Sequence, residues 1–255
     1  MSIHLSVNVN KVATLRNSRG GRQPSVLDAV AVCLDAGVAG ITVHPRGDRR
    51  HITPEDVHDI ARALRDKRPG VEYNIEGDPR PDLIALVRDV APDQCTLVPV
   101  VPGEITSQAG WREGAASEGL PRVVADLKSR RIRVSLFVDP EPASIRFAAA
   151  AGADRVELYT EPFARAFERG AMDAKRSFAV YAAAANLAHS LGLGVNAGHD
   201  LDLDNLMLFR DLPHLAEVSI GHAVMSRALF VGLETVVREY LVVLGGSSRT
   251  QSSVG

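Results

Sequence analysis

Short apolar runs alternate with longer amphipathic segments along almost the whole chain. The short runs are dense in Val, Ile and Leu, as is typical of parallel strands covered by helices. Predicted strands lie at 4–10, 39–44, 71–76, 94–100, 132–139, 154–160, 194–199 and 217–222. Several longer segments carry apolar residues at i, i+3, i+4 and i+7, which predicts helices. These are expected at 25–37, 53–67, 82–91, 120–131, 142–152, 171–192, 203–212 and 223–244.

Local signals support the ends of several predicted helices. Thr53 and Pro54, followed by two acidic residues, form a typical helix start. Gly37, Gly152 and Gly192 stand where glycines commonly end helices. The boundaries are therefore supported by chemistry as well as by periodicity.

The order of these elements predicts an α/β fold, a (β/α)8 TIM barrel, in one catalytic domain at 1–244. A doubly wound open sheet is the structural alternative. Against it, the first strand is followed by NKVATLRNSRGGRQP, and the chain contains no GxGxxG dinucleotide turn. The small and polar segment at 245–255 is expected to be a disordered tail.

Composition excludes several classes of protein. The chain has 255 residues, of which 45% are hydrophobic, and a net charge of -2, which does not favour a general nucleic-acid or membrane-surface protein. Cys33 and Cys95 lack metal-binding spacing and are interpreted as buried thiols. The amino terminus lacks the features of a signal peptide, and no window has the roughly 18 apolar residues of a membrane span. We expect a soluble, cytoplasmic protein.

Four histidines end a predicted strand or follow one closely. They are His44, His51, His199 and His222. A TIM barrel collects its reactive groups at the carboxyl ends of its strands, so these imidazoles are candidate site residues. The remaining histidines are interpreted as structural or exposed, namely His4, His58, His189 and His214.

Arginines are concentrated after the first two predicted strands. The first loop contains Arg16, Arg19 and Arg22, and the second contains the run RGDRRH. Arginine binds phosphate oxygens in bidentate fashion, and the small residues of NAGHD and IGHAV allow backbone amides to approach an anion. Together these features favour a phosphorylated substrate, although RGDRRH is also compatible with a solvated loop.

Glu72 is a candidate general base. It alternates with Tyr73 within an apolar run, and a buried carboxylate there would have a raised pKa suited to proton transfer near neutral pH. The alternative is an exposed charge at a strand edge.

A metal site and a lysine Schiff base are two further types of chemistry to compare with these residues. A metal held by His44, His51 and His199 is not favoured, because HxH and HExxH spacings are absent and the surroundings are basic. Lys11 follows the first strand and is compatible with a Schiff base. A ligand for phosphate or hydroxyl groups is the favoured interpretation of Lys11.

Specific motifs along nearly the whole chain carry a family resemblance. They are SVNVNKVATLRNSRGG, GITVHPRGDRRHIT, VEYNIE, LVPVVPGEITSQAGW, VSLFVD, ELYTEPFA, LGVNAGHDL and SIGHAVMSRALFVGL. In these motifs and in their order, the chain resembles the pyridoxine 5′-phosphate synthase family of vitamin B6 biosynthesis. The resemblance implies a TIM barrel with extra helices, assembled as a homo-octamer and working without a metal or organic cofactor.

The resemblance also implies a reaction and residue roles. The family condenses 1-deoxy-D-xylulose 5-phosphate with 3-amino-2-oxopropyl phosphate, giving pyridoxine 5′-phosphate, inorganic phosphate and water. By motif match, His44 and Glu72 would be general bases and His199 the general acid. The aminoketone phosphate would be held by Asn8, Arg19, the backbone after His199 at Asp200, Gly221 and His222. The deoxyxylulose phosphate would be held by Asn10, Lys11, Arg46, His51 and Thr106.

Four positions depart from the family pattern. Many members have Asp-His where this chain has Asn10-Lys11, and Gly where it has Asp200; Gly47 replaces a common acidic residue. Lys11 keeps a donor and adds a fixed charge, so sugar-phosphate binding is expected to survive with altered affinity. Asp200 adds a negative charge beside the expected phosphate loop.

Three functions are therefore compared. The first is the ring-closing synthase, and the second is a Schiff-base aldolase using Lys11 on the same barrel. The third is a non-catalytic sensor of phosphorylated metabolites, motivated by the basic pocket alone. The presence of His44, Glu72 and His199 favours an enzyme, because a sensor needs anion donors but no acid and base. The segment 101–119 is long and glycine-rich, and is expected to be a lid.

Overall fold

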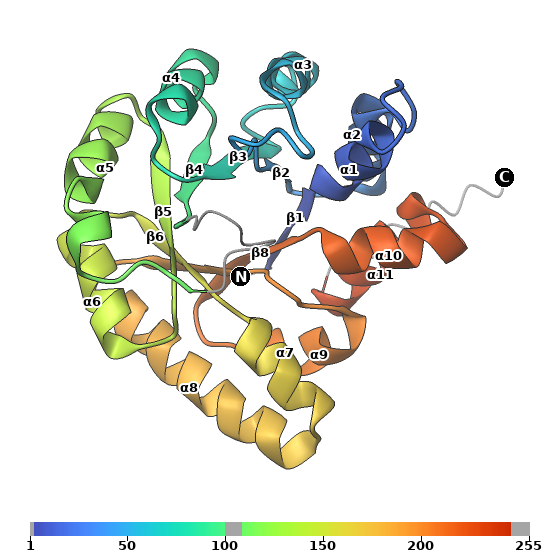
Figure 1. Cartoon of the computed structure of the whole chain (residues 1–255). Coiled ribbons are helices and arrows are strands. Elements are labelled where there is room, and N and C mark those ends of the chain that lie inside the picture. Colours follow the sequence, from blue (N-terminus) through green and yellow to red (C-terminus); the bar gives the residue numbers. More distant parts are fainter. Residues whose placement is uncertain (1–2, 100–108, 246–255) are drawn as a thin grey trace, which may run out of the picture.

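The computed structural model describes residues 3–99 and 109–245, and in it eight parallel strands form a closed barrel (Figure 1). Each strand pairs with the next one along the chain, and the last pairs with the first. The predicted TIM barrel is thus confirmed, and the open sheet is excluded. The strands are β1 (His4–Asn8), β2 (Gly40–Val43), β3 (Glu72–Gly77), β4 (Gln94–Leu97), β5 (Arg133–Val138), β6 (Arg155–Leu158), β7 (Gly194–Ala197) and β8 (Leu215–Ile220).

Helices surround the barrel, and three of the βα units carry an additional one (Figure 1). The units after β1, β6 and β8 each hold two α-helices, which agrees with the expected extra helices. The helices are α1 (Asn10–Asn17), α2 (Val26–Ala36), α3 (Pro54–Leu64), α4 (Pro81–Val90), α5 (Leu120–Ser129), α6 (Pro142–Ala150), α7 (Glu161–Glu168), α8 (Ala171–Ser190), α9 (Leu203–Phe209), α10 (His222–Val231) and α11 (Leu233–Val243). A short 3-10 helix, η1, spans Ala115–Ser117.

The helix ends show which local signals were informative. Thr53 caps α3 in a reciprocal capping box with Asp56, as its sequence predicts. The segment predicted as one helix at 223–244 is instead two helices, because Gly232 takes a φ of +87° between α10 and α11. That left-handed conformation suits glycine and interrupts the helix.

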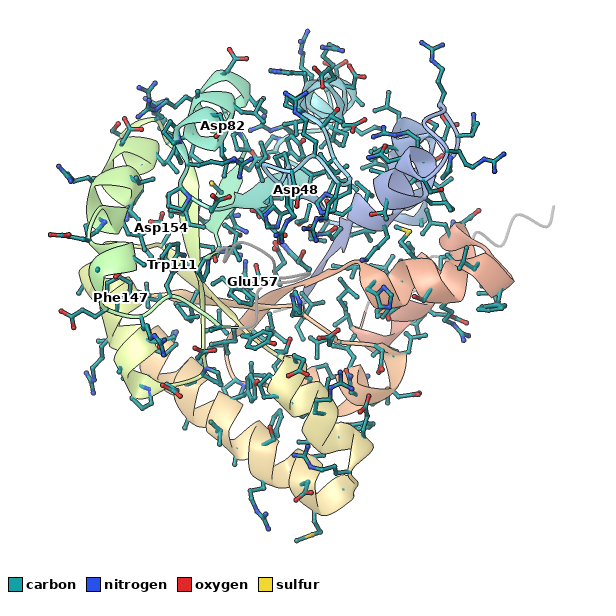
Figure 2. All side chains as sticks on the ribbon, viewed as in Figure 1. Asp48, Asp82, Trp111, Phe147, Asp154 and Glu157 are labelled. Carbon is teal, nitrogen blue, oxygen red and sulfur yellow. The ribbon has the colours of Figure 1, made fainter. Side chains whose placement is uncertain are left out.

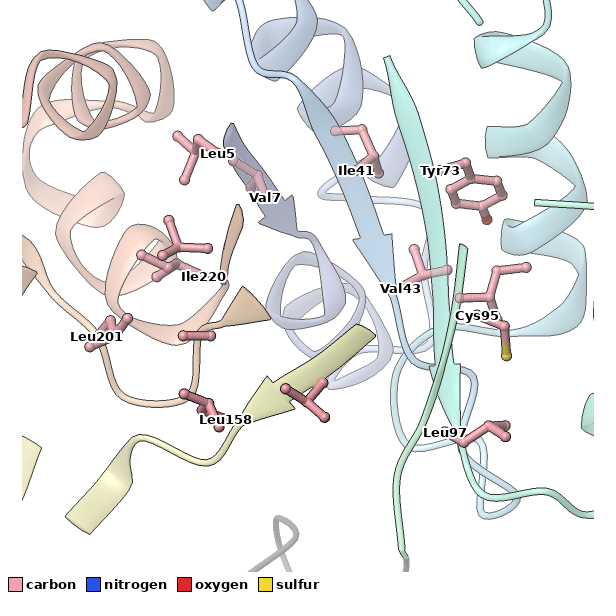
Figure 3. Packing of buried hydrophobic residues seen from close by; sticks show 14 of the residues in the cluster. Leu5, Val7, Ile41, Val43, Tyr73, Cys95, Leu97, Leu158, Leu201 and Ile220 are labelled. Carbon is pink, nitrogen blue, oxygen red and sulfur yellow. The ribbon is translucent and has the colours of Figure 1, made fainter. Parts of the chain in front are cut away.

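The apolar core lies between the barrel and its helices. Leu5, Val7, Ile41 and Val43 are all fully buried, and they point from the strands into this outer layer (Figure 3). Since successive side chains of a strand point to opposite faces, these residues define the outward face of the barrel wall. Hydrophobic burial therefore fixes the helices against the wall.

The inward face of the barrel is polar. Hydrogen bonds between side chains join neighbouring strands there, from Ser6 to Thr42 at 2.7 Å and from Thr96 to Asn74 at 3.1 Å. The buried polar residues of the strands are Ser6, Thr42, Asn74, Glu76, Gln94, Thr96, Ser135, Glu157, Asn196, Glu217 and Ser219. Branched aliphatic layers usually fill a TIM barrel, so the polar interior distinguishes this one.

Some expectations concern residues outside the described ranges. Thr106, the first part of the expected lid at 101–108 and nearly all of the predicted tail at 245–255 lie there. Within residues 3–99 and 109–245, no helix has both the length and the apolar character needed to cross a bilayer.

Candidate active site

A cavity of about 480 Å³ opens at the carboxyl ends of the strands. Residues from several βα units line it, as the general organisation of TIM barrels leads one to expect. Of the predicted site residues, it brings together Asn8, Asn10, Lys11, His44, Arg46, His51, His199, Asp200, Gly221 and His222. Ten of the 21 described lining residues are thus among those selected from the sequence.

Two predicted residues lie outside this lining. Arg19 is exposed, two residues beyond the end of α1, and does not line the cavity. Glu72 is the first residue of β3, at the amino end of the strand, and pairs with the guanidinium of Arg133. It does not line the cavity either.

A second carboxyl of β3 does line the cavity. Glu76 lies four residues further along the strand than Glu72, which is about 13 Å at the usual rise per residue. Its Oε2 accepts a hydrogen bond of 3.3 Å from Asn8. Glu76 is thus the carboxyl of β3 that faces the cavity.

The side chains of Glu76 and His44 lie close together in the cavity. His44 Nδ1 lies 4.0 Å from Glu76 Oε2, and Asn10 Oδ1 accepts a 2.9 Å hydrogen bond from the backbone N–H of His44. Asn10 thereby holds the chain that carries this imidazole. The carboxyl and the imidazole are close enough for a reacting group to contact both.

Burial shifts both groups toward their neutral forms. It raises the pKa of Glu76 to about 8, with a further contribution from the charge of Glu217. It lowers the pKa of His44 to about 3, and repulsion from Arg46 and from His51 in its protonated form adds to the effect. Near neutral pH, His44 is a neutral imidazole able to accept a proton, and the Glu76 carboxyl can exchange one.

His199 follows β7 and lies on the other side of the cavity. Its ring contacts two aromatic rings, with centroids 6.0 Å from Phe137 and 5.6 Å from Tyr159. Thr160 donates a hydrogen bond to its backbone carbonyl. Burial lowers the pKa of His199, and the neighbouring Asp200 opposes that shift. These contacts fix the position of His199, while its pKa remains sensitive to nearby charge.

Two glycines let the turns after β7 and β8 pack closely against neighbouring strands, Gly198 against β8 and Gly221 against the end of β1. A Cβ on Gly198 would lie 2.0 Å from the carbonyl oxygen of Ser219, and one on Gly221 would lie 2.9 Å from that of Asn8. Gly221 directly precedes α10, which begins at His222. The first N–H groups of a helix lack intrahelical acceptors and attract anions, so this corner of the cavity suits a phosphate.

Positive side chains lie at the opposite edge of the cavity. Lys11 and Arg50 line it together with the buried Arg46, whose Nε lies 3.8 Å from Asp48. Burial lowers the pKa of the adjacent His51 to about 4, with Arg46 and Lys11 contributing. The fixed charge here comes from the two arginines and the lysine, and it suits a second anionic group.

Glu157 is a site residue that the sequence interpretation did not select. It projects from β6 near the centre of the barrel (Figure 2), lines the cavity and is 5% exposed. Burial and the nearby Glu76 raise its pKa. Its position in RVELYT, between two outward-facing apolar residues, was the available signal. Within the described residues, no group of three or more His, Cys, Asp and Glu is placed to hold a metal ion.

A second cavity, of about 610 Å³, lies outside the barrel between α3 and α4. Arg62, Arg65 and Arg68 line it with His58 and Asp89. Much of this charge is already paired: Arg62 with Asp59, Arg68 with Asp93, and His58 with Asp89 at 3.8 Å. The cavity between α3 and α4 is therefore lined mainly by charge that is already paired. It has no counterpart of the buried Glu76 and His44 that line the cavity at the strand ends.

Comparison with known proteins identifies the family. The family model described as pyridoxal phosphate biosynthesis protein PdxJ matches residues 5–245. The chain belongs to the PdxJ family. It is 49% identical to a pyridoxine 5′-phosphate synthase of Leptospira biflexa, covering 97% of this chain and 99% of that protein. A pyridoxine 5′-phosphate synthase of Xanthomonas campestris is 48% identical, with coverage of 98% and 99%.

These matches confirm the resemblance inferred from the motifs. The PdxJ chain is an enzyme, a pyridoxine 5′-phosphate synthase of vitamin B6 biosynthesis. The expectations of an aldolase and of a sensor are thereby set aside.

Solved structures of other enzymes share the fold. A thiamine phosphate pyrophosphorylase from Pyrococcus furiosus superposes with a TM-score of 0.60 at 13% identity, covering 95% of this chain and 96% of that one. A phosphoribosylanthranilate isomerase from Thermotoga maritima gives 0.59 at 12% identity, covering 96% and 100%. At these identities the similarity supports the barrel alone.

Proposed function

We propose that the cavity condenses 3-amino-2-oxopropyl phosphate with 1-deoxy-D-xylulose 5-phosphate, with His44 and Glu76 exchanging the protons of the reaction. The observation that carries this proposal is the 4.0 Å approach of the His44 imidazole to the buried Glu76 carboxyl. Amine attack on a ketone, loss of water and phosphate, and ring closure all move protons. The Schiff base of this reaction joins the two substrates and needs no enzyme lysine.

Each phosphate has an anchoring region in the proposal. The aminoketone phosphate binds at the corner formed by Asn8, Gly221 and His222, where backbone amides approach it. The deoxyxylulose phosphate binds at the opposite edge, with Asn10, Lys11, Arg46 and His51 as its contacts. Lys11 is exposed at the rim, which supports a ligand role because Schiff-base lysines are activated by desolvation or by a neighbouring cation.

His199 acts as the general acid once substrate is bound. Its pKa is lowered in the free protein, mainly by burial. A phosphate dianion bound next to Asp200 would add negative charge, raise that pKa and favour the imidazolium form. Substrate binding would thus prepare the proton donor that expulsion of a leaving group requires.

The matched pair Glu76→Gln and Glu72→Gln tests the assignment of the base. Glu76→Gln should lower kcat by two or more orders of magnitude (about 10²–10⁴ for a general base), because an amide cannot accept the proton. Glu72→Gln should keep most of the turnover, since that carboxylate lies at the far end of β3. Release of phosphate and formation of pyridoxine 5′-phosphate, measured with both substrates, give the rates. The assignment fails if Glu72→Gln is the inactive variant.

Other implications of the resemblance stay predictions. Arg19 and Thr106 are proposed phosphate contacts, and a rise in KM for one substrate in Arg19→Ala or Thr106→Ala would support them. The homo-octamer is testable by light scattering on the purified chain. The absence of a metal requirement is testable by assay after chelation, and the cytoplasmic location by cell fractionation.

A further inference from the structure

The interior of the barrel contains more acidic than basic side chains. Glu76, Glu157 and Glu217 are only 8%, 5% and 2% exposed, and Glu217 neither lines the cavity nor has a role in the proposed reaction. Four carboxyl groups share this interior with two guanidinium groups, from β3, β5, β6 and β8: Glu72, Glu76, Glu157 and Glu217, with Arg133 and Arg155.

The two arginines do not compensate all of this charge. Arg133 is engaged with Glu72 and donates a 2.9 Å hydrogen bond to Gln94. Arg155 donates a 2.9 Å hydrogen bond to Asn196 Oδ1. Within residues 3–99 and 109–245, no ion pair joins an arginine or lysine to Glu76, Glu157 or Glu217 within 4.0 Å.

Strand register places Glu217 at the level of Glu157. Glu157 is in register with Asn196, and Asn196 with Glu217, so the three side chains form one row across β6, β7 and β8. Asn196 also donates a 3.4 Å hydrogen bond to Glu217 Oε1. The Cα atoms of the two glutamates are therefore about 10 Å apart, two strand spacings.

Ionised carboxylates without cations are costly in such an interior. The charge left over after the Glu72–Arg133 pair is three carboxyl groups for one guanidinium. Buried carboxylates that lie close together lower this free-energy cost by binding protons. The row beneath the cavity is thus expected to retain protons at pH values where exposed carboxyls have lost theirs.

We propose that Glu217 is a positioning residue for catalysis, which shares a retained proton with Glu157 and Glu76 and so keeps the Glu76 carboxyl able to exchange a proton near neutral pH. The proposal rests on the assigned role of Glu76 in the proposed function. Burial raises the pKa of Glu217 to about 8, and the charge of Glu217 in turn contributes to the raised pKa of Glu76. The proton held in this row is the one available to Glu76 between turnovers.

Charged and titratable groups on or after six of the strands lie around this row or line the cavity above it. They are Lys11 after β1, His44 and Arg46 after β2, Glu72 on β3, Arg133 on β5, Arg155 on β6 and His199 after β7. His44 stays neutral over the relevant range because its pKa is about 3. The carboxyl row is accordingly expected to dominate titration of the interior between pH 6 and 9.

Two variants of Glu217 separate charge from packing. Glu217→Gln keeps the size but removes the charge, so the acidic limb of the kcat/KM profile should move about one unit to lower pH. Glu217→Asp keeps the charge and should restore the parental profile. If Glu217 serves packing alone, Glu217→Asp should lower activity more than Glu217→Gln does, and neither variant should shift the pH profile. That result would overturn the proposal.

An infrared titration tests the retained proton without turnover. The parent should show a protonated-carboxyl band above pH 6, with a midpoint near 8, that loses amplitude in Glu76→Gln. In Glu217→Gln the midpoint of the remaining band should fall by about one unit. A parent without the band, or an unmoved midpoint in Glu217→Gln, refutes the inference. A parental band with these properties but no pyridoxine 5′-phosphate from verified substrates refutes the proposed function instead.

Discussion

Glu72 and Glu76 have the same chemistry and face the same side of one strand, yet only Glu76 lines the cavity. The period of two along β3 places Glu72, Asn74 and Glu76 all inward. The face of a strand is therefore readable from sequence, but depth along the barrel depends on where the strand begins. That boundary comes from pairing with neighbours, such as Gly40 with Glu72.

The raised pKa of Glu76 has a consequence for stability at the residue scale. Between its ordinary value of 4.5 and about 8, the folded protein binds more protons at this group than the unfolded chain does. Stability contributed by this group is complete below pH 4.5 and is lost as pH rises through 8. Glu76→Gln should therefore become more stable than the parent as pH rises from 5 to 9, by at least about 1 kcal/mol.

Urea denaturation of both proteins across this range measures the effect. Glu168→Gln, on the exposed surface of α7, is the matched control and should give a difference that does not vary with pH. A constant difference between Glu76→Gln and the parent would show that the carboxyl is ionised in both states.

At the scale of elements, the eight strands were predictable because each carries a dense apolar face toward the helices. Helices α1 and α7 were not predicted from the sequence. The split between α10 and α11 depends on the backbone of Gly232, which periodicity alone does not reveal. Candidate residues at strand ends were correctly grouped because strand ends converge in any closed barrel.

The close approach of the turn after β7 to strand β8 gives a prediction at this scale. Gly198→Ala would place a methyl group 2.0 Å from the Ser219 carbonyl oxygen, so the turn must move away from β8. We expect a loss of stability of about 1–3 kcal/mol and a raised KM for the aminoketone phosphate. Thermal unfolding and steady-state kinetics test this.

Gly119→Ala provides the matched control, because nothing lies within 4 Å of its added Cβ. It should leave the unfolding temperature unchanged. An unaltered KM in Gly198→Ala would show that the packing of this turn against β8 does not affect phosphate binding.

At the scale of the whole molecule, the barrel fold and the family could be predicted from the sequence, whereas the polar interior of the barrel was not predicted. Strand segments rich in Val, Ile and Leu suggested apolar residues on both faces. The structure shows apolar side chains on the outward face and Ser, Thr, Asn, Gln, Glu and Arg inside. Alternation within short runs such as VEYNIE already contained this information, but the dense apolar content obscured it.

The polar barrel interior also bears on the heat capacity of the protein. Exposure of apolar surface raises the heat capacity on unfolding, whereas exposure of polar surface lowers it. A barrel filled with amides, hydroxyls and carboxyls should therefore unfold with a heat-capacity change below the usual value of about 12–15 cal/mol/K per residue. Scanning calorimetry at several pH values gives this quantity directly. The expected result is a flatter dependence of stability on temperature, so the enzyme would keep its folded population over a broader thermal range than a barrel with an aliphatic centre.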